Sequence, residues 1–127
     1  MSKEQETCVS DIEQLANMLD RTLAETCRLN DRLRVQGRGG MVHITNGIAA
    51  LGPSTINQVM AAVASFDAFN DDNDPNGEHD CAILTVAGVR VIWKIDYLDR
   101  SRRFRSPDAS DPKVTVRVLT VMRADEY

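Results

Sequence analysis

The chain has 127 residues, a formal net charge of −4, 27% charged residues and 43% hydrophobic residues. These totals fit one globular domain, and the acidic balance argues against general nucleic-acid binding, which favours basic domains. The sequence has no apolar run of signal-peptide or membrane-span length, so we expect a cytoplasmic protein that does not act on membranes.

The three cysteines lie far apart in the chain, at Cys8, Cys27 and Cys81. Their number is odd and no Cys-x-x-Cys pair occurs, which argues against a disulfide framework or a structural zinc site. We therefore expect free thiols, and no metal or cofactor.

Residues 8–35 have the pattern of one long helix. Ile12, Leu15, Leu19, Leu23, Thr26 or Cys27, and Leu33 recur at helical spacings and form one stripe, while Ser10 and Glu13 fit a capping box. The pattern favours a helix that faces the core along this stripe. Pairing with a partner helix is the alternative.

The next segment alternates turns with short elements. Gly37 in "QGRGG" fits a helix C-cap, "MVHIT" at 41–45 predicts a strand, and "NG" at 46–47 predicts a turn. Pro53 suits the first turn of a second helix, which we expect to end near Phe69. Its predicted buried residues are Ile56, Val59, Met60, Val63 and Phe66.

Three strands are predicted in the remaining chain, at 81–86, 89–98 and 113–122, and Ala87-Gly88 forms a hairpin turn between the first two. Alternation places Trp93 on the face of the second strand that meets the helices. The expected fold is α+β: one domain over 1–127 with an antiparallel sheet of three to four strands and two helices packed on one face. The inward row is Val89, Val91, Trp93, Ile95 and Tyr97.

The stretch "DDNDPNGEHD" at 71–80 is rich in carboxylates. From Asp72 it follows the start of a calcium-binding loop, but position twelve is Ile83, where that loop needs a bidentate Glu. A metal-dependent hydrolase centred on Asp72, Asp74, His79 and Asp80 is an alternative. In the more economical interpretation these residues shape a turn, with Asp80 orienting His79.

Six acids and no Lys or Arg occur between residues 67 and 80, which is more negative charge than a turn needs. We therefore predict that this loop binds a partner. Four arginines and Phe104 lie within the polar loop 99–112, where they could pair with the acidic loop, contact RNA or phosphate, or join the partner interface. The predicted partner-binding residues are Asp67, Asp71, Asp72, Asp74, Glu78, Asp80, Arg102, Arg103 and Phe104.

Several long strings occur in order: "NDRLR", "GRGG", "TNGIAALGP", "FDAFNDDNDPNGEHD", "WKIDYLDR", "SPDASDP" and "RVLTVMRADEY". Together they resemble a family of small proteobacterial proteins, often carried on plasmids or phages and catalogued as a domain of unknown function. The resemblance covers 29–127, with 1–28 as a helical extension. It implies no catalytic residues, only a setting among accessory genes of mobile DNA.

The sequence favours a non-enzymatic, acidic protein-binding module. The resemblance adds a hypothesis: an inhibitor of host defence, of anti-CRISPR or anti-restriction type, that blocks a basic nucleic-acid-binding surface on a larger protein or ribonucleoprotein complex. We do not expect direct nucleic-acid binding. The alternatives are the hydrolase and a regulator that binds nucleic acid through its arginines.

Overall fold

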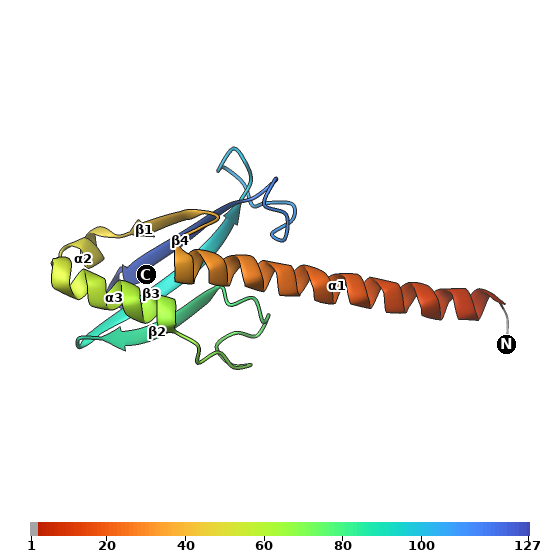
Figure 1. Ribbon diagram of the computed structural model, residues 1–127, viewed down its shortest axis with the longest axis horizontal. Coiled ribbons are helices and arrows are strands. Elements are labelled where there is room, and N and C mark those ends of the chain that lie inside the picture. The colour runs from red at the N-terminus through yellow and green to blue at the C-terminus, as the bar shows by residue number, and fades with distance from the viewer. Residues whose placement is uncertain (1–2) are drawn as a thin grey trace.

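The computed structural model describes the backbone of residues 3–127 and the side chains of residues 11–127. A long N-terminal helix leads into a small domain of four strands and three short helices (Figure 1). In chain order the elements are α1 (Lys3–Gln36), β1 (Met41–Ile44), α2 (Asn46–Ala49), α3 (Pro53–Ser65), β2 (Cys81–Val86), β3 (Val89–Leu98), β4 (Val116–Arg123) and the 3-10 turn η1 (Ala124–Glu126). Within this described part, no helix is long and apolar enough to cross a membrane.

The four strands form one sheet in the order β1-β4-β3-β2. β2, β3 and β4 are antiparallel neighbours, as predicted, whereas β1 lies parallel to β4 at the edge. The α+β class and the strand number are therefore confirmed, and the sheet is mixed rather than wholly antiparallel. The connection from β1 to β4 contains two helices and two strands, so nothing local to β1 fixes its direction.

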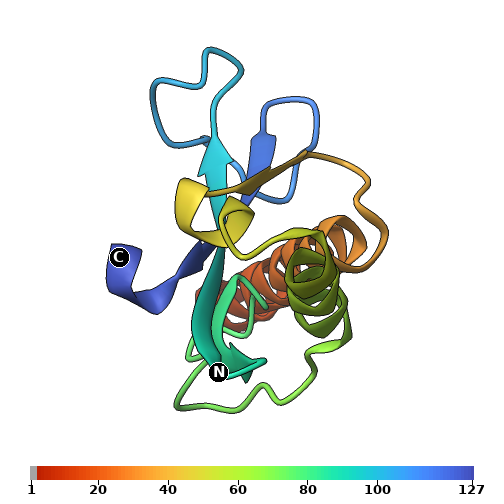
Figure 2. The same ribbon diagram turned by 90° about the vertical axis from the view of Figure 1, so that its left-hand side faces the viewer.

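The inward row of β3 builds the core. Trp93 is fully buried, with 0% of its surface accessible to solvent, and lies between Ala82 of β2 and Val121 of β4. The C-terminal half of α1 and the helix α3 cover this face of the sheet (Figure 2). Alternation along a strand that is buried on one side therefore predicted the sheet face correctly.

Several element ends differ from the predictions. α3 ends at Ser65, not near Phe69, because Phe66 and Phe69 fold back to pack edge-on against Trp93, with ring centroids 6.2 and 6.1 Å away. The predicted turn at 46–47 is the start of α2, whose Ile48 is fully buried. The last strand begins at residue 116 rather than 113.

The glycines after α1 position the helix against the sheet. Gly37 adopts a φ of +68° and its N–H donates to the Leu33 carbonyl at 2.8 Å, so it caps the helix as predicted. Gly40 has no room for a side chain, because a Cβ there would lie 2.5 Å from the carbonyl oxygen of Arg117. Close contact between this turn and β4 therefore depends on the absence of a side chain.

The apolar stripe of α1 is divided between two environments. Leu29 and Leu33 are buried in the domain, but Ile12, Leu15, Leu19 and Leu23 are exposed by 39–66%. Figure 1 shows why: the N-terminal half of the helix projects beyond the domain. The expectation that the whole stripe faces the core is therefore wrong for this half, because the sheet and α3 extend only to the last turns of the helix.

Replacement of Trp93 tests the assignment of the sheet faces. We expect Trp93→Ala to lower the free energy of unfolding by about 3–5 kcal/mol, because it leaves a cavity against Phe66 and Phe69. Ile83→Ala, on the exposed face of β2, is the control and should cost well under about 1.5 kcal/mol. Urea denaturation followed by circular dichroism measures both values, and equal losses would show that the sheet faces are reversed.

Candidate functional site

The acidic loop, residues 66–80, holds its six carboxylates in two groups. Asp67, Asp71 and Asp72 are exposed, and none of them forms an ion pair with a side chain of residues 11–127. Asp74 is buried, while Glu78 and Asp80 are partly buried. The predicted partner-binding acids therefore do not share one surface: three face solvent and three face the domain.

Asp74 organises the loop from within. Its two carboxylate oxygens accept the backbone N–H of His79 at 3.2 and 3.3 Å, and its own N–H donates to the Asn70 carbonyl at 2.8 Å. Asn70 in turn accepts the N–H groups of Asp72 and Asn73 through its side chain, at 2.9 Å each. These local bonds are those of an Asx-type turn, so the turn interpretation holds for this part of the stretch.

His79 is held by Asp31 of α1. Its Nδ1 lies 3.0 and 3.1 Å from the two oxygens of the Asp31 carboxylate, and its ring stacks on Phe69 with centroids 3.9 Å apart. The prediction that Asp80 orients His79 is therefore wrong. The residue that orients it is 48 positions away in the sequence, on a helix that the motif does not include.

Arg34 links the same carboxylate to the end of α3. Its Nη2 donates to Asp31 at 3.0 Å, and its Nη1 donates to the carbonyl oxygens of Val63, Ala64 and Phe66 at 2.8, 3.0 and 2.8 Å. The carbonyls at a helix C-terminus lack partners within the helix. Arg34 donates hydrogen bonds to three carbonyls at this end of α3. It thereby fixes the place where α3 ends and the acidic loop begins.

Cys27 completes a small cluster with Asp31 and His79. The thiol donates to Asp31 over 3.8 Å, and ligand-type atoms of the three residues lie within 4.8 Å of one another. In this arrangement the Asp31 carboxylate accepts hydrogen bonds from the thiol, from His79 and from Arg34. Burial, followed by the nearby charge of Asp31, raises the pKa of Cys27 to about 11, which keeps the thiol protonated near neutral pH.

The four residues of the alternative hydrolase do not converge on one point. Among the residues that the structure describes, the group with metal-ligand spacing is Cys27, Asp31 and His79, which leaves out Asp72, Asp74 and Asp80. Asp72 faces solvent and Asp74 is occupied by the His79 backbone. The geometry therefore lacks the shared centre that metal-assisted hydrolysis requires.

A second polar network lies deeper, around Asn30. The fully buried Asn30 side chain donates to the Tyr97 hydroxyl at 2.7 Å and to the Glu78 carbonyl at 3.0 Å, and it accepts from Arg117 Nε at 2.7 Å. Tyr97 donates onward to the Glu78 carboxylate at 2.7 Å, and Arg117 also donates to the Ala109 carbonyl. Burial, then the bond to Glu78, raises the pKa of Tyr97. Glu78 is thus a structural acid that joins the loop to β3.

The arginine loop, residues 99–106, continues from β3 and folds back so that its two ends are joined by backbone hydrogen bonds. The Asp99 N–H donates to the Phe104 carbonyl at 2.8 Å, and the Asp99 carbonyl accepts from the Arg102 N–H at 2.9 Å. The Ser106 N–H donates to the Tyr97 carbonyl at 2.9 Å. The Asp99 carboxylate also accepts from the Ser101 hydroxyl at 2.6 Å, and this bond lowers the pKa of Asp99. A single carboxylate therefore organises the tip that carries the predicted Arg102, Arg103 and Phe104.

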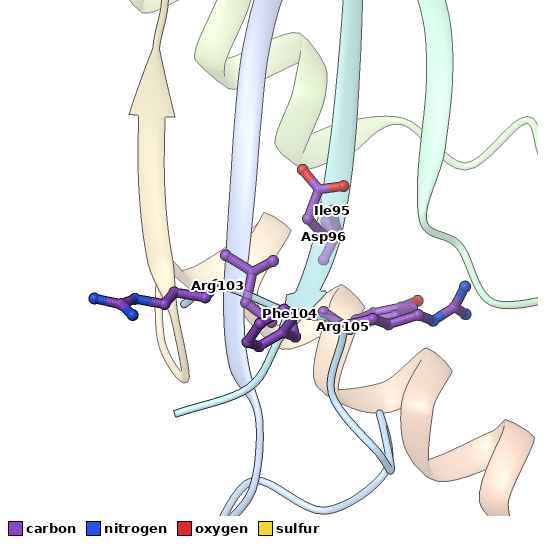
Figure 3. Close-up of a pocket in the computed structure, with 7 residues that line it drawn as sticks. Ile95, Asp96, Arg103, Phe104 and Arg105 are labelled. Carbon is purple, nitrogen blue, oxygen red and sulfur yellow. The ribbon is translucent and has the colours of Figure 1, made fainter. Parts of the chain in front are cut away.

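Phe104 is 69% exposed and borders a hollow of about 330 Å³ at the end of β3. Figure 3 shows Arg103 and Arg105 extending to opposite sides with Phe104 between them. The described side chains give these two arginines no ion pair. Figures 1 and 2 place this loop and the acidic loop on opposite sides of α1, so the suggested pairing between the two loops is not formed.

Sequence reasoning missed the residues that hold the site together: Asn30, Asp31, Arg34 and Arg117. Two signals were available. Asn30 falls on the buried side of a helix next to Leu29 and Leu33, and Arg117 falls in the inward row of β4. A polar residue in an apolar row predicts a buried hydrogen bond, although neither signal identifies the partner. Cys27 and Cys81 are free, as predicted, and Cys8 lies outside the described side chains.

The sequence matches a known protein family over most of the small domain. Residues 44–126 match the family described as protein of unknown function (DUF3768). The match spans more than half of the chain, so the protein belongs to this family. No curated protein and no solved structure matches the chain.

The raised pKa of Cys27 predicts a loss of stability at alkaline pH. An unfolded thiol titrates near its ordinary value of 9.0, whereas the folded thiol titrates near 11. The unfolded chain therefore loses its proton first, and the stabilisation present below about pH 9 disappears as the pH rises towards 11. We expect the wild-type melting temperature to fall in this window, and Cys27→Ala to reduce the fall.

Thermal melts of the two proteins, recorded by circular dichroism, make this comparison. The curves of melting temperature against pH should be parallel between about pH 6 and 8, where the thiol is protonated in both states. Parallel curves up to pH 11 would contradict the assignment of the raised pKa to Cys27.

Proposed function

We propose that this protein is a non-enzymatic binding module that docks on a basic protein surface through the exposed carboxylates of Asp67, Asp71 and Asp72. The observation that carries the proposal is the division of the acidic loop: Asp74 and Glu78 are bonded inward, while these three face solvent without an ion-pair partner among the described side chains. A loop that is fixed from within loses little conformational entropy on binding.

The carboxylates suit a surface that otherwise holds phosphates. Asp71 and Asp72 are adjacent and Asp67 precedes Asp71 by four residues, so three exposed carboxylates fall within six positions of the loop. Arginine and lysine side chains that bind phosphates also bind carboxylates. A basic nucleic-acid groove on a larger protein or ribonucleoprotein complex therefore fits the proposal, and the net charge of −4 favours the encounter.

In its narrower form, the proposal is an inhibitor of host defence carried on a mobile element, of anti-CRISPR or anti-restriction type. The family resemblance supports the setting, and a short acidic chain that occupies a basic groove supplies the mechanism. Enzymatic function has less support, because Asp72 faces solvent, while the Asp74 carboxylate, 3.8 Å from His79 Nε2, already accepts the His79 backbone N–H.

Reversal of the loop charge tests this function. In a host with an active restriction or CRISPR system, we expect expression of the wild type to raise phage plating efficiency at least tenfold. We expect Asp71→Lys with Asp72→Lys to abolish this rise, because the loop would then repel a basic groove. Both residues are exposed, so the melting temperature should change little.

The matched control exchanges two exposed carboxylates elsewhere, Asp20→Lys with Asp125→Lys, and produces the same change in net charge. It should retain most of the wild-type effect. Equal loss in both double variants would point to net charge alone, and full activity of the Asp71/Asp72 variant would contradict docking through the acidic loop.

The arginine loop favours a second candidate, a contact with single-stranded nucleic acid. Phe104 is exposed between Arg103 and Arg105, and an aromatic ring between guanidinium groups offers base stacking next to phosphate contacts. The same loop also fits a secondary contact with the protein partner. The acidic balance of the chain argues against the nucleic-acid role.

Fluorescence anisotropy of a labelled single-stranded RNA distinguishes the two functions. If acidic docking is the main function, wild type and Phe104→Ala should both bind the RNA no better than non-specifically, with a dissociation constant of roughly 100 μM or weaker at physiological salt. Tighter binding that Phe104→Ala weakens at least tenfold, and that falls steeply with salt, would favour the nucleic-acid regulator.

A further inference from the structure

Three side chains of the kinds that bind metal ions meet between α1 and the end of the acidic loop. Cys27 and Asp31 are four residues apart on α1, so they lie on one face of the helix. His79 reaches the same place from the loop, 48 residues after Asp31. Ligand atoms of the three residues lie within 4.8 Å of one another. The fold therefore gathers a thiol, a carboxylate and an imidazole that spacing in the sequence does not connect.

We propose that Cys27 Sγ, Asp31 Oδ2 and His79 Nδ1 bind one Zn²⁺ ion. A thiolate and an imidazole favour zinc, whereas calcium and magnesium take oxygen ligands. With three protein ligands, zinc keeps a fourth position for water. The side chains of His79 and Asp31 are 30% and 37% exposed, so solvent reaches the site. On binding, the thiol releases its proton to solvent, as a ligating thiol must.

The distances are close to those of a tetrahedral site. Zinc bonds of about 2.0 Å to nitrogen or oxygen and about 2.3 Å to sulfur imply about 3.3 Å between nitrogen and oxygen and about 3.5 Å between sulfur and either atom. His79 Nδ1 lies 3.1 Å from Asp31 Oδ2, and Cys27 Sγ lies 3.8 Å from the same oxygen. Sγ and Nδ1 are at most 4.8 Å apart, so they need to approach by no more than about 1.3 Å. Rotation of the Cys27 side chain supplies a movement of this size.

Groups behind the ligands hold two of them in place. His79 Nε2 lies 3.8 Å from Oδ2 of Asp74, whose side chain is only 4% exposed. A ligating histidine characteristically directs its second ring N–H towards a carboxylate. Arg34 Nη2 donates to Asp31 Oδ1 at 3.0 Å and leaves Oδ2 for the metal. Each of these two ligands therefore has an outer partner that orients it.

The local charges fit a divalent cation. The Cys27 thiolate and the carboxylates of Asp31 and Asp74 carry three negative charges. Arg34 supplies one positive charge at 3.0 Å from Asp31, and a zinc ion supplies the remaining two. A buried or half-buried group of charges is most stable when its members are paired, so the ion completes the balance.

The backbone of His79 gives an independent reason. Its φ of +55° lies in the left-handed region, which residues other than glycine rarely adopt. The two Asp74 oxygens hold its N–H at 3.2 and 3.3 Å, and Phe69 stacks on its ring with centroids 3.9 Å apart. Such strained conformations persist where surrounding contacts impose them, and they cluster at ligand-binding sites. Here the strain directs Nδ1 towards Asp31.

Calorimetric titration of the metal-free full chain with zinc tests the site, and it needs no partner because the docking carboxylates are other residues. We expect one ion per chain with a dissociation constant of about 1 μM or tighter at about pH 7.5. Millimolar magnesium or calcium should not compete, because thiolate and imidazole are poor ligands for these cations. Binding weaker than about 100 μM, or displacement of zinc by magnesium, would overturn the proposal.

Single replacements identify the ligands. Cys27→Ser keeps a hydrogen-bond donor for Asp31 but removes the thiolate, and His79→Asn removes the imidazole while tolerating the left-handed backbone. Each should weaken zinc binding at least about a hundredfold. Cys81→Ser and His43→Asn remove a cysteine and a histidine outside the group and should keep the wild-type affinity. Unchanged affinity in Cys27→Ser, or an equal loss in Cys81→Ser, would assign the ion to other residues.

Cobalt(II) in place of zinc reports the ligand set by its absorption spectrum. We expect the intense visible bands of tetrahedral coordination and a thiolate charge-transfer band in the near ultraviolet. The charge-transfer band should disappear in Cys27→Ser and persist in Cys81→Ser. Circular dichroism of the metal-free variants should match the wild type, which separates loss of a ligand from loss of the fold. A weak octahedral spectrum without the charge-transfer band would overturn the assignment of Cys27.

Discussion

The buried side chain of Asn30 is the constraint on which the domain depends. One amide group bonds to β3 through Tyr97, to β4 through Arg117 and to the acidic loop through the Glu78 carbonyl. An amide has few donors and acceptors to offer, and here they connect three segments that are distant in the sequence. Because an unpaired buried polar group is costly, the network fixes α1, the sheet and the loop in one arrangement.

The next turn of α1 anchors the acidic loop at the surface of the domain. Asp31 holds His79 at the end of the acidic loop, and Arg34 holds the carbonyls where the loop begins. Both ends of the loop are thus attached to the same helical turn, and Asp74 braces its interior. The exposed Asp71 and Asp72 consequently lie on a loop that is anchored at both ends, and an anchored loop would lose less conformational entropy on binding than a mobile tail.

Local periodicity predicted the strands, the hairpin and the burial of Trp93, because alternation and turn chemistry depend on neighbours in the sequence. It could not predict that Asp74 and Glu78 face inward, since their partners are a folded-back backbone and Tyr97. The same limit applies to His79, whose neighbour Asp80 is adjacent in sequence while Asp31 is adjacent in space. A count of six acids therefore gave twice the number of carboxylates that face solvent.

The two halves of α1 have separate physical roles, although the family match begins only at residue 44. The C-terminal half supplies Asn30, Asp31 and Arg34, so residues 44–126 alone would leave Tyr97 and Arg117 without their central partner. In the N-terminal half, the described side chains of residues 11–20 are all exposed and contribute nothing to this core.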